Sequence, residues 1–153
     1  MKINKIVCIF PVLLSLSNYA AAGQDYTYSD LNIEREQVIR NYILDLERAD
    51  AEEISALFEE GGTVISTSRG TVNAKDFFHG FLPEIELAST ELHQSFINNV
   101  DNNLYAARFH FKFKLKDGET GEGEYIDEFK FSNNSTKLTS VYMFENLKFN
   151  VKN

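Results

Sequence analysis

The spacing of apolar residues changes from a helical period to a strand period near Pro83, and this change constrains the fold most. Before it, apolar residues recur at three- and four-residue spacing, as in Val38, Ile39, Tyr42, Ile43 and Leu46. After it, they recur at every second position, most clearly over residues 104–116. The first spacing is typical of an amphipathic helix and the second of a half-buried strand. The chain is therefore expected to form helices followed by long strands.

Three helices are predicted in the first half. The first covers residues 31–48. Asp50 is the predicted N-cap of the second, because Glu53 follows three residues later in capping-box position. This second helix is expected to end at Gly61-Gly62 and to bury Ile54, Leu57 and Phe58.

A short strand and a third helix complete this half. Residues 63–67 are rich in β-branched side chains and predict a strand. Asn73 is the predicted N-cap of the third helix, which stops near Pro83. Its apolar residues are Phe77, Phe78, Phe81 and Leu82.

Four strands are predicted in the second half, with turns at residues 117–121 and 133–136. Their ranges are 92–100, 104–116, 122–131 and 138–147. Helices that precede a run of strands indicate an α+β domain. We therefore expect a curved antiparallel sheet with three N-terminal helices packed on its apolar face.

The two longest strands predict a register, because opposite charges and aromatic pairs stabilise neighbouring strands. The predicted pairs are Lys116–Glu122, Lys114–Glu124, His110–Glu128, Phe113–Tyr125 and Phe109–Phe129. In this arrangement the acidic strand neutralises the basic stripe beside it. The stripe therefore does not indicate a nucleic-acid site.

Residues 1–22 have the three parts of a cleavable signal peptide. Lys2 and Lys5 give a positive start, residues 6–16 are mostly apolar, and Ala20-Ala21-Ala22 offers small residues for cleavage. A membrane anchor would need ~20 apolar residues, about twice this run. We therefore expect export to the periplasm or the medium.

Cleavage before Gly23 would leave a flexible lead-in at 23–30 and one domain at 31–153. A lipoprotein signal is not expected, since Cys8 lies at the start of the apolar run. Cys8 is the only cysteine, so the exported domain would have no disulfide and no thiol chemistry. Its core would rely on aromatic residues, of which the sequence has 13 Phe and 7 Tyr.

The net charge is −8 and becomes more negative without the two signal-peptide lysines. Nucleic acids and anionic membranes both require a basic surface, so neither partner is expected for the mature form. Gly118, Gly121 and Gly123 lie between antiparallel strands, whereas a phosphate loop joins a strand to a helix. No cofactor is predicted.

Residues 33–147 resemble the nuclear-transport-factor-2-like superfamily and, within it, the SnoaL-like proteins, which include polyketide cyclases and ketosteroid isomerases. The matching stretches are 42–50, 56–64, 74–78 and 125–131. The resemblance implies a cone, also called a cystatin-like fold, in which the sheet wraps around the helices and leaves a pocket at its open end. Because members include enzymes, binding proteins and dimerisation domains, the fold alone does not assign a function.

The resemblance to ketosteroid isomerases implies roles for Tyr42 and Asp127 as the pair that stabilises an oxyanion. Asp127 shares the aromatic strand face with Tyr125 and Phe129, where a carboxyl group is expected to be desolvated and its pKa raised. The same class is a known example of a carboxylic acid kept neutral by an apolar site. A structural hydrogen bond that ties helix to sheet is the alternative for this pair.

The general base of ketosteroid isomerases is replaced in this sequence, because the corresponding position is Ser66. A serine cannot serve as that base, so ketosteroid isomerisation is not expected. Another acid–base reaction would require His79, His93 or Glu145 to reach the pocket. The histidines lack metal-ligand spacing, so no metal site is predicted.

We therefore predict an exported domain that binds a small apolar or aromatic molecule. The predicted ligand-binding residues are Tyr42, Phe58, Ser66, Phe78, Phe111, Tyr125 and Asp127. One alternative is a SnoaL-like isomerase, cyclase or dehydratase that uses Asp127 and Tyr42. Another is a structural domain that forms a homodimer through the outer sheet face, with an apolar patch supplied by Val141 and Met143 or by Tyr142 and Phe144.

Overall fold

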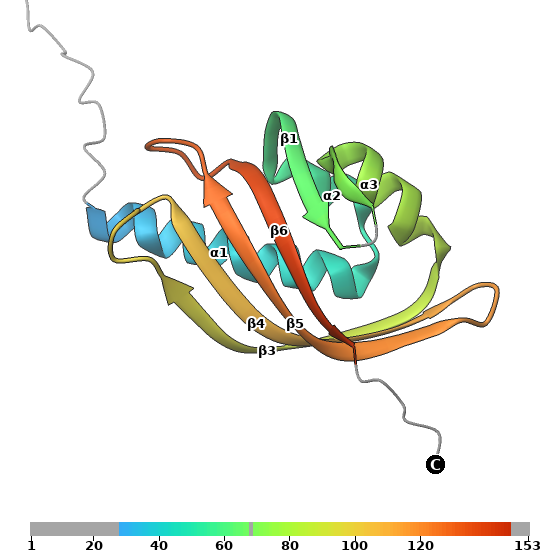
Figure 1. Cartoon of the computed structure of the whole chain (residues 1–153). Helices are drawn as coiled ribbons and strands as arrows, with labels where there is room; N and C mark the ends of the chain where they lie inside the picture. The colour runs from blue at the N-terminus through green and yellow to red at the C-terminus, as the bar shows by residue number, and fades with distance from the viewer. Residues whose placement is uncertain (1–27, 68, 148–153) are drawn as a thin grey trace, which may run out of the picture.

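The computed structural model describes residues 28–67 and 69–147 (Figure 1). Its helices are α1 (Tyr28–Arg48), α2 (Ala51–Ala56), α3 (Ala74–Phe81) and the 3-10 turn η1 (Leu82–Glu84). Its strands are β1 (Phe58–Ser66), β2 (Gly70–Asn73), β3 (Ile85–Ile97), β4 (Leu104–Leu115), β5 (Thr120–Phe131) and β6 (Leu138–Leu147). The predicted signal peptide, residues 1–22, lies outside the described residues.

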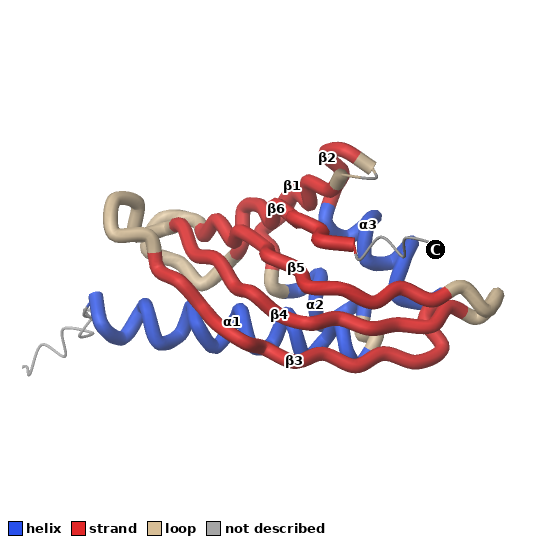
Figure 2. The backbone as a smooth tube through the Cα atoms, turned by 60° about the horizontal axis from the view of Figure 1, so that its bottom comes forward, coloured by secondary structure: helices blue, strands red, loops and turns tan. Residues whose placement is uncertain are grey.

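A six-stranded sheet with the order β2-β1-β6-β5-β4-β3 forms one layer of the domain. The long strands curve, and the helices lie on one side of the sheet (Figures 1 and 2). The α+β prediction is confirmed. The sheet is not wholly antiparallel, however, since β1 runs parallel to β6 and only the other pairs are antiparallel. In the described part of the chain, no helix is long and apolar enough to cross a membrane.

The helix caps are those that the sequence predicts. The side chain of Asp50 accepts a hydrogen bond from the Glu53 amide at 3.1 Å, and that of Asn73 accepts one from the Asp76 amide at 3.3 Å. These contacts satisfy amides that have no partner within the helix. The first helix begins at Tyr28, so the last three residues of the predicted lead-in are helical rather than flexible.

The predicted end of the second helix is wrong. This helix ends at Ala56, and Phe58 already belongs to β1, opposite Leu138 of β6. Gly61 has a φ of +78°, which glycine adopts without strain, and the register shifts between Phe58 and Thr63. Pairing with β6 thus prevails over local helical preference.

Two further differences concern strands. The segment Gly70–Asn73 pairs with β1 as a short edge strand that the sequence did not predict. Similarly, β3 begins at Ile85 rather than at Leu92, and its first residues pair with the end of β4. Both segments lie at edges of the sheet, where few side chains are buried and the alternation of apolar residues is weak.

The predicted register of β4 and β5 is also wrong, although the predicted faces are right. Lys114 lies opposite Thr120, four positions earlier than expected, because the turn is tighter than predicted. Asp117 accepts a hydrogen bond from the Glu119 amide at 3.0 Å, and Gly118 has a φ of +96°. An even shift keeps each side chain on its face. The new pairs include Lys112–Glu122, His110–Glu124, Phe113–Gly121 and Phe109–Tyr125.

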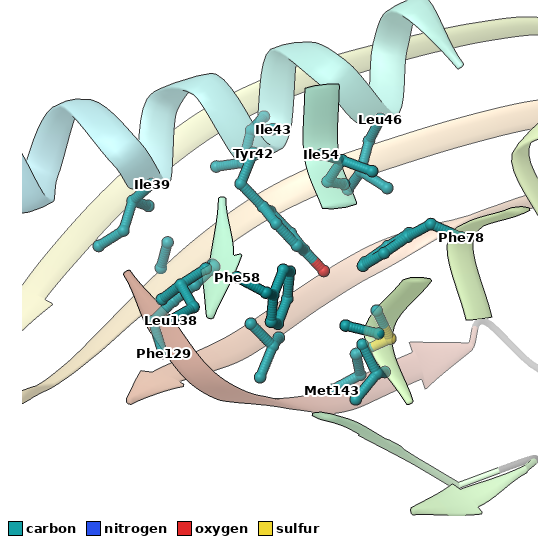
Figure 3. Packing of buried hydrophobic residues seen from close by; sticks show 14 of the residues in the cluster. Ile39, Tyr42, Ile43, Leu46, Ile54, Phe58, Phe78, Phe129, Leu138 and Met143 are labelled. Atoms are coloured by element: carbon teal, nitrogen blue, oxygen red, sulfur yellow. The ribbon is translucent and has the colours of Figure 1, made fainter. Parts of the chain in front are cut away.

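The core lies between the helices and the concave face of the sheet. From α1 it receives the predicted stripe of Ile39, Tyr42, Ile43 and Leu46, all buried (Figure 3). The Tyr42 ring meets Phe129 edge-on at a centroid distance of 5.0 Å and Phe78 at 5.9 Å. Burying each large apolar side chain contributes about 1.5–3 kcal/mol.

A buried arginine holds the N-terminal half of α1 in place. Arg35 is 1% exposed and donates hydrogen bonds to two loops. Its acceptors are the carbonyls of Asn102, Ser132 and Ser135 and the side chain of Asn103, at 2.8–3.0 Å. The guanidinium also lies 5.0 Å from the Phe131 ring centroid. This residue therefore anchors the helix to the β3–β4 and β5–β6 turns.

Candidate functional site

A buried hydrogen bond joins the first helix to the middle of the sheet. The hydroxyl of Tyr42 donates to Oδ2 of Asp127 at 3.0 Å, and the two residues are 0% and 1% exposed. Tyr42 comes from the apolar stripe of α1. Asp127 lies on the concave face of β5 between Ala107 of β4 and Met143 of β6. The two side chains therefore meet as the sequence predicts.

The surroundings of Tyr42 keep its hydroxyl protonated. Burial raises the pKa of Tyr42 well above its ordinary value, and the charge of Asp127 and the hydrogen bond to it act in the same direction. A buried hydroxyl is costly unless it has a partner. Asp127 supplies that partner, so Tyr42 is a neutral hydrogen-bond donor at physiological pH.

A cavity of about 310 Å³ adjoins this pair. Its wall is formed by α1, α3, the loop between β1 and β2, and strands β4, β5 and β6. The lining residues are Tyr42, Leu46, Arg69, Phe77, Phe81, Phe109, Phe111, Phe113, Gly121, Tyr125, Asp127 and Met143. Most of this wall is aromatic, and its polar side chains are few.

The aromatic rings of the wall contact one another. Phe81 of α3 meets Phe113 of β4 edge-on at 5.4 Å. Tyr125 of β5 is stacked with Phe109 at 5.7 Å and meets Phe111 at 5.8 Å. Such pairs are each stabilised by about 0.5–1.5 kcal/mol beyond the area that they bury. The wall is thus held in place by its own packing.

The predicted ligand-binding residues divide into two groups. Tyr42, Asp127, Phe111 and Tyr125 line the cavity. The other three, Phe58, Ser66 and Phe78, are buried and are not among the residues that line it.

Each of these three has a different environment. The Phe58 and Phe78 rings pack against each other at 5.9 Å in the core. The Ser66 hydroxyl, at the end of β1, accepts a hydrogen bond from the Arg69 amide at 3.1 Å. This contact helps to shape the loop that carries the lining residue Arg69.

Several lining residues were not among the predicted ligand-binding residues. The phenylalanines Phe77, Phe81, Phe109 and Phe113 were expected chiefly as core. Their helical or alternating spacing shows which face is apolar but does not distinguish core from cavity wall. Gly121 enters the wall only in the observed register, opposite Phe113. Arg69 lies in a loop with no periodic pattern, so no sequence signal pointed to it.

The histidines do not line the cavity. His79 lies on α3, 3.7 Å from Glu52. His93 and His110 lie on the outer sheet face, 3.4 and 3.1 Å from Oε1 of Glu124. The outward position predicted for His110 is confirmed, but its partners are Glu124 and Glu122 rather than Glu128.

Two other expectations concern Glu145 and metals. Glu145 lies on β6 opposite Tyr125, and its side chain is outside the described part of the structure. Among residues 28–67 and 69–147, no group of three or more His, Cys, Asp or Glu side chains could hold a metal ion.

Solved structures with this architecture identify the fold. No protein-family model matches the sequence, and no curated protein matches it. A putative isomerase from Bacillus subtilis has a TM-score of 0.66 at 13% identity, over 76% of this chain and 88% of that one. The BvnE pinacolase from Penicillium brevicompactum has a TM-score of 0.65 at 12% identity, over the same shares.

A third similar structure is an NTF2-like protein of unknown function from Burkholderia pseudomallei. Its TM-score is 0.59 at 10% identity, over 74% of this chain and 91% of that one. The chain thus has the nuclear-transport-factor-2-like fold, as the sequence resemblance implies. At these identities the similarity defines the fold and leaves the function to the site.

Proposed function

We propose that this protein is an exported domain that binds a small apolar or aromatic molecule in the cavity beside Tyr42 and Asp127. One observation carries the proposal: a buried tyrosine–carboxyl hydrogen bond forms part of the wall of a mostly aromatic cavity. Export rests on the signal-peptide pattern of residues 1–22. No cofactor is part of the proposal.

The size and chemistry of the cavity support binding. Ligand pockets are typically about 300–1,000 Å³, mostly apolar, with a few polar groups that orient the ligand. A cavity of about 310 Å³ is at the lower end of this range. An apolar ligand body would be favoured by the phenylalanine rings, while the Tyr42–Asp127 pair offers a polar contact for a hydroxyl or carbonyl group.

Binding is favoured over turnover by the environment of Ser66. In the resemblance to ketosteroid isomerases, this position corresponds to the general base. The side chain here is a serine, whose hydroxyl accepts a hydrogen bond from the Arg69 amide, and Ser66 does not line the cavity. Proton transfer requires a base within hydrogen-bond reach of the substrate. Of the candidate groups whose side chains are described, neither His79 nor His93 lines the cavity.

A SnoaL-like isomerase, cyclase or dehydratase is the alternative that the same pair supports. Two of the similar structures carry the names of an isomerase and a pinacolase. In such an enzyme, Tyr42 and a protonated Asp127 would donate hydrogen bonds that stabilise developing negative charge on a substrate oxygen. Turnover that is abolished by Asp127→Ala, with an unchanged circular dichroism spectrum, would favour this alternative.

A thermal-shift screen with apolar acids, phenols and steroids tests the binding proposal. We expect at least one class to raise the unfolding temperature, and Tyr42→Phe and Asp127→Asn to weaken its binding. A ligand whose affinity is unchanged in both variants would exclude this pair from the site. If no class binds at millimolar concentration, the proposal is wrong.

A homodimer through the outer sheet face is a second candidate role. Tyr142 and Phe144 of β6 stack at a centroid distance of 4.4 Å, and they are 38% and 49% exposed. Ile126 lies opposite Phe144 on β5 and is 44% exposed. Of the two residue pairs considered from the sequence, Val141 and Met143 are buried in the core. Tyr142 and Phe144 are therefore the pair that remains available.

A further inference from the structure

Arg69 adds a cationic group to the exposed end of the cavity wall. It follows β1 in the loop that leads to β2, and its side chain is exposed, whereas Tyr42 and Asp127 are buried. Its guanidinium carbon lies 5.4 Å from the ring centroid of Phe77, a neighbouring lining residue. The cavity thus extends from a buried hydrogen-bonded pair to an arginine at its mouth.

Among the side chains that the structure describes, which exclude that of Glu145, no carboxylate pairs with this arginine. The ion pairs of the domain lie elsewhere, mainly on the outer sheet face. Among the described lining residues, Asp127 is the only acid; it is buried and accepts the hydrogen bond of the Tyr42 hydroxyl. When a guanidinium group packs against an aromatic ring, the N–H donors along the edge of the guanidinium still point outward and can bind an anion. Arg69 is therefore available to a ligand.

The charge of the whole chain makes this position distinctive. With a net charge of −8, the protein disfavours the approach of anions in general. A single arginine beside an aromatic cavity reverses this preference locally, because guanidinium and carboxylate form charge-assisted, bidentate hydrogen bonds. The combination of an apolar interior and a cationic mouth matches a molecule with one apolar end and one anionic end.

We propose that the ligand is a small carboxylic acid whose apolar body fills the cavity and whose carboxylate pairs with Arg69. This inference rests on the proposed binding function and specifies its ligand class. A volume of about 310 Å³ corresponds to about ten water-sized groups, at roughly 30 Å³ each. A single aromatic ring with a short acidic side chain fits this size.

Two matched probes test the proposal: hydrocinnamate and its neutral amide, which have nearly the same shape. Their dissociation constants would be measured by NMR titration, following the ring signals of Phe111, Phe113 and Tyr125 to locate binding in the cavity. We expect the acid to bind about tenfold more tightly than the amide, as a charge-assisted hydrogen bond allows.

Arg69→Gln should weaken binding of the acid about tenfold and leave that of the amide within about twofold. Arg69→Lys should recover part of the loss, since it restores the charge but not the planar fork. Arg40→Gln is the matched control, because Arg40 is an exposed arginine of α1 that does not line the cavity. It should leave both affinities unchanged.

The outcomes separate this inference from the function on which it rests. If acid and amide bind equally, or if Arg69→Gln weakens both alike, the cavity binds ligands but Arg69 does not select an acid. If Arg40→Gln weakens the acid as much as Arg69→Gln does, the effect is one of overall charge. If neither probe shifts the cavity signals and the broader screen also finds no ligand, the binding function itself is wrong.

Discussion

Tyr42 and Asp127 are 85 positions apart in the sequence, and their side chains share a buried hydrogen bond of 3.0 Å. The bond connects α1 to β5 across the core and also forms part of the cavity wall. A single contact therefore has both a structural and a candidate functional role. The two roles can be separated, because stability and ligand affinity are measured independently.

A double-mutant cycle with Tyr42→Phe and Asp127→Leu tests the structural role. Each change removes one side of this buried hydrogen bond, so each should lower the free energy of unfolding by about 1–3 kcal/mol. The double variant should lose less than the sum, with a coupling of about 1 kcal/mol or more. Urea denaturation measures these values. Additive losses would show that the hydrogen bond contributes nothing to stability.

The raised pKa of Tyr42 predicts a loss of stability in alkali. Above a pH of about 10, the unfolded chain releases the Tyr42 proton, whereas burial and Asp127 keep it bound in the folded state. The folded state then holds more protons, so stability falls as pH rises, by up to about 1.4 kcal/mol per pH unit.

Tyr42→Phe should remove this part of the pH dependence. The measurement is urea denaturation between about pH 9 and 11 for both proteins, where the difference isolates Tyr42 from the other tyrosines. Parallel curves would contradict the prediction, because they would mean that Tyr42 ionises as readily in the folded protein as in the unfolded chain.

Gly121→Ala should disturb both the fold and the cavity. A Cβ at this position would lie 2.3 Å from the Phe113 ring, so the ring must move. Overpacking of this kind costs about 1–3 kcal/mol. Because Phe113 lines the cavity, its displacement should also change the affinity of any cavity ligand. Thermal denaturation and ligand titration measure the two effects.

Gly80→Ala is the matched control for the stability measurement. Its added Cβ would meet only an Arg69 nitrogen at 3.7 Å, which is ordinary contact, and Gly80 is helical and exposed. This change should be neutral or stabilise the protein by up to about 1 kcal/mol. Equal effects of the two substitutions would show that Phe113 adapts without cost.

The exposed aromatic pair on the outer sheet face predicts that the protein forms a dimer. If two copies associate through Tyr142 and Phe144, the double variant Tyr142→Ser/Phe144→Ser should shift the protein from dimer to monomer in sedimentation velocity. Both side chains are substantially exposed, so the fold should survive. Leu87→Ser is the control, since Leu87 is 64% exposed and lies on edge strand β3. A wild-type protein that is monomeric at all concentrations would exclude this interface.

Periodicity predicted the elements whose burial is one-sided. The stripe of α1, the caps at Asp50 and Asn73, and the alternation of β4 and β5 all follow from local chemistry. The same alternation placed Asp127 on the aromatic face, and the family resemblance paired it with Tyr42. Because an even register shift preserves faces, this prediction survived an error in the register itself.

The tertiary structure decided several features that depend on contacts between distant segments. Pairing with β6 ends α2 early and places Phe58 in the core. The β1–β2 loop brings Arg69 to the cavity, and two turns enclose the buried Arg35.

The sequence by itself thus determined which faces are apolar and that a helix tyrosine and a strand aspartate point inward. It could not determine which phenylalanines fill the core and which leave space. The buried face of a helix or strand follows from the spacing of its apolar residues, whereas the position of a cavity depends on how whole elements pack against one another.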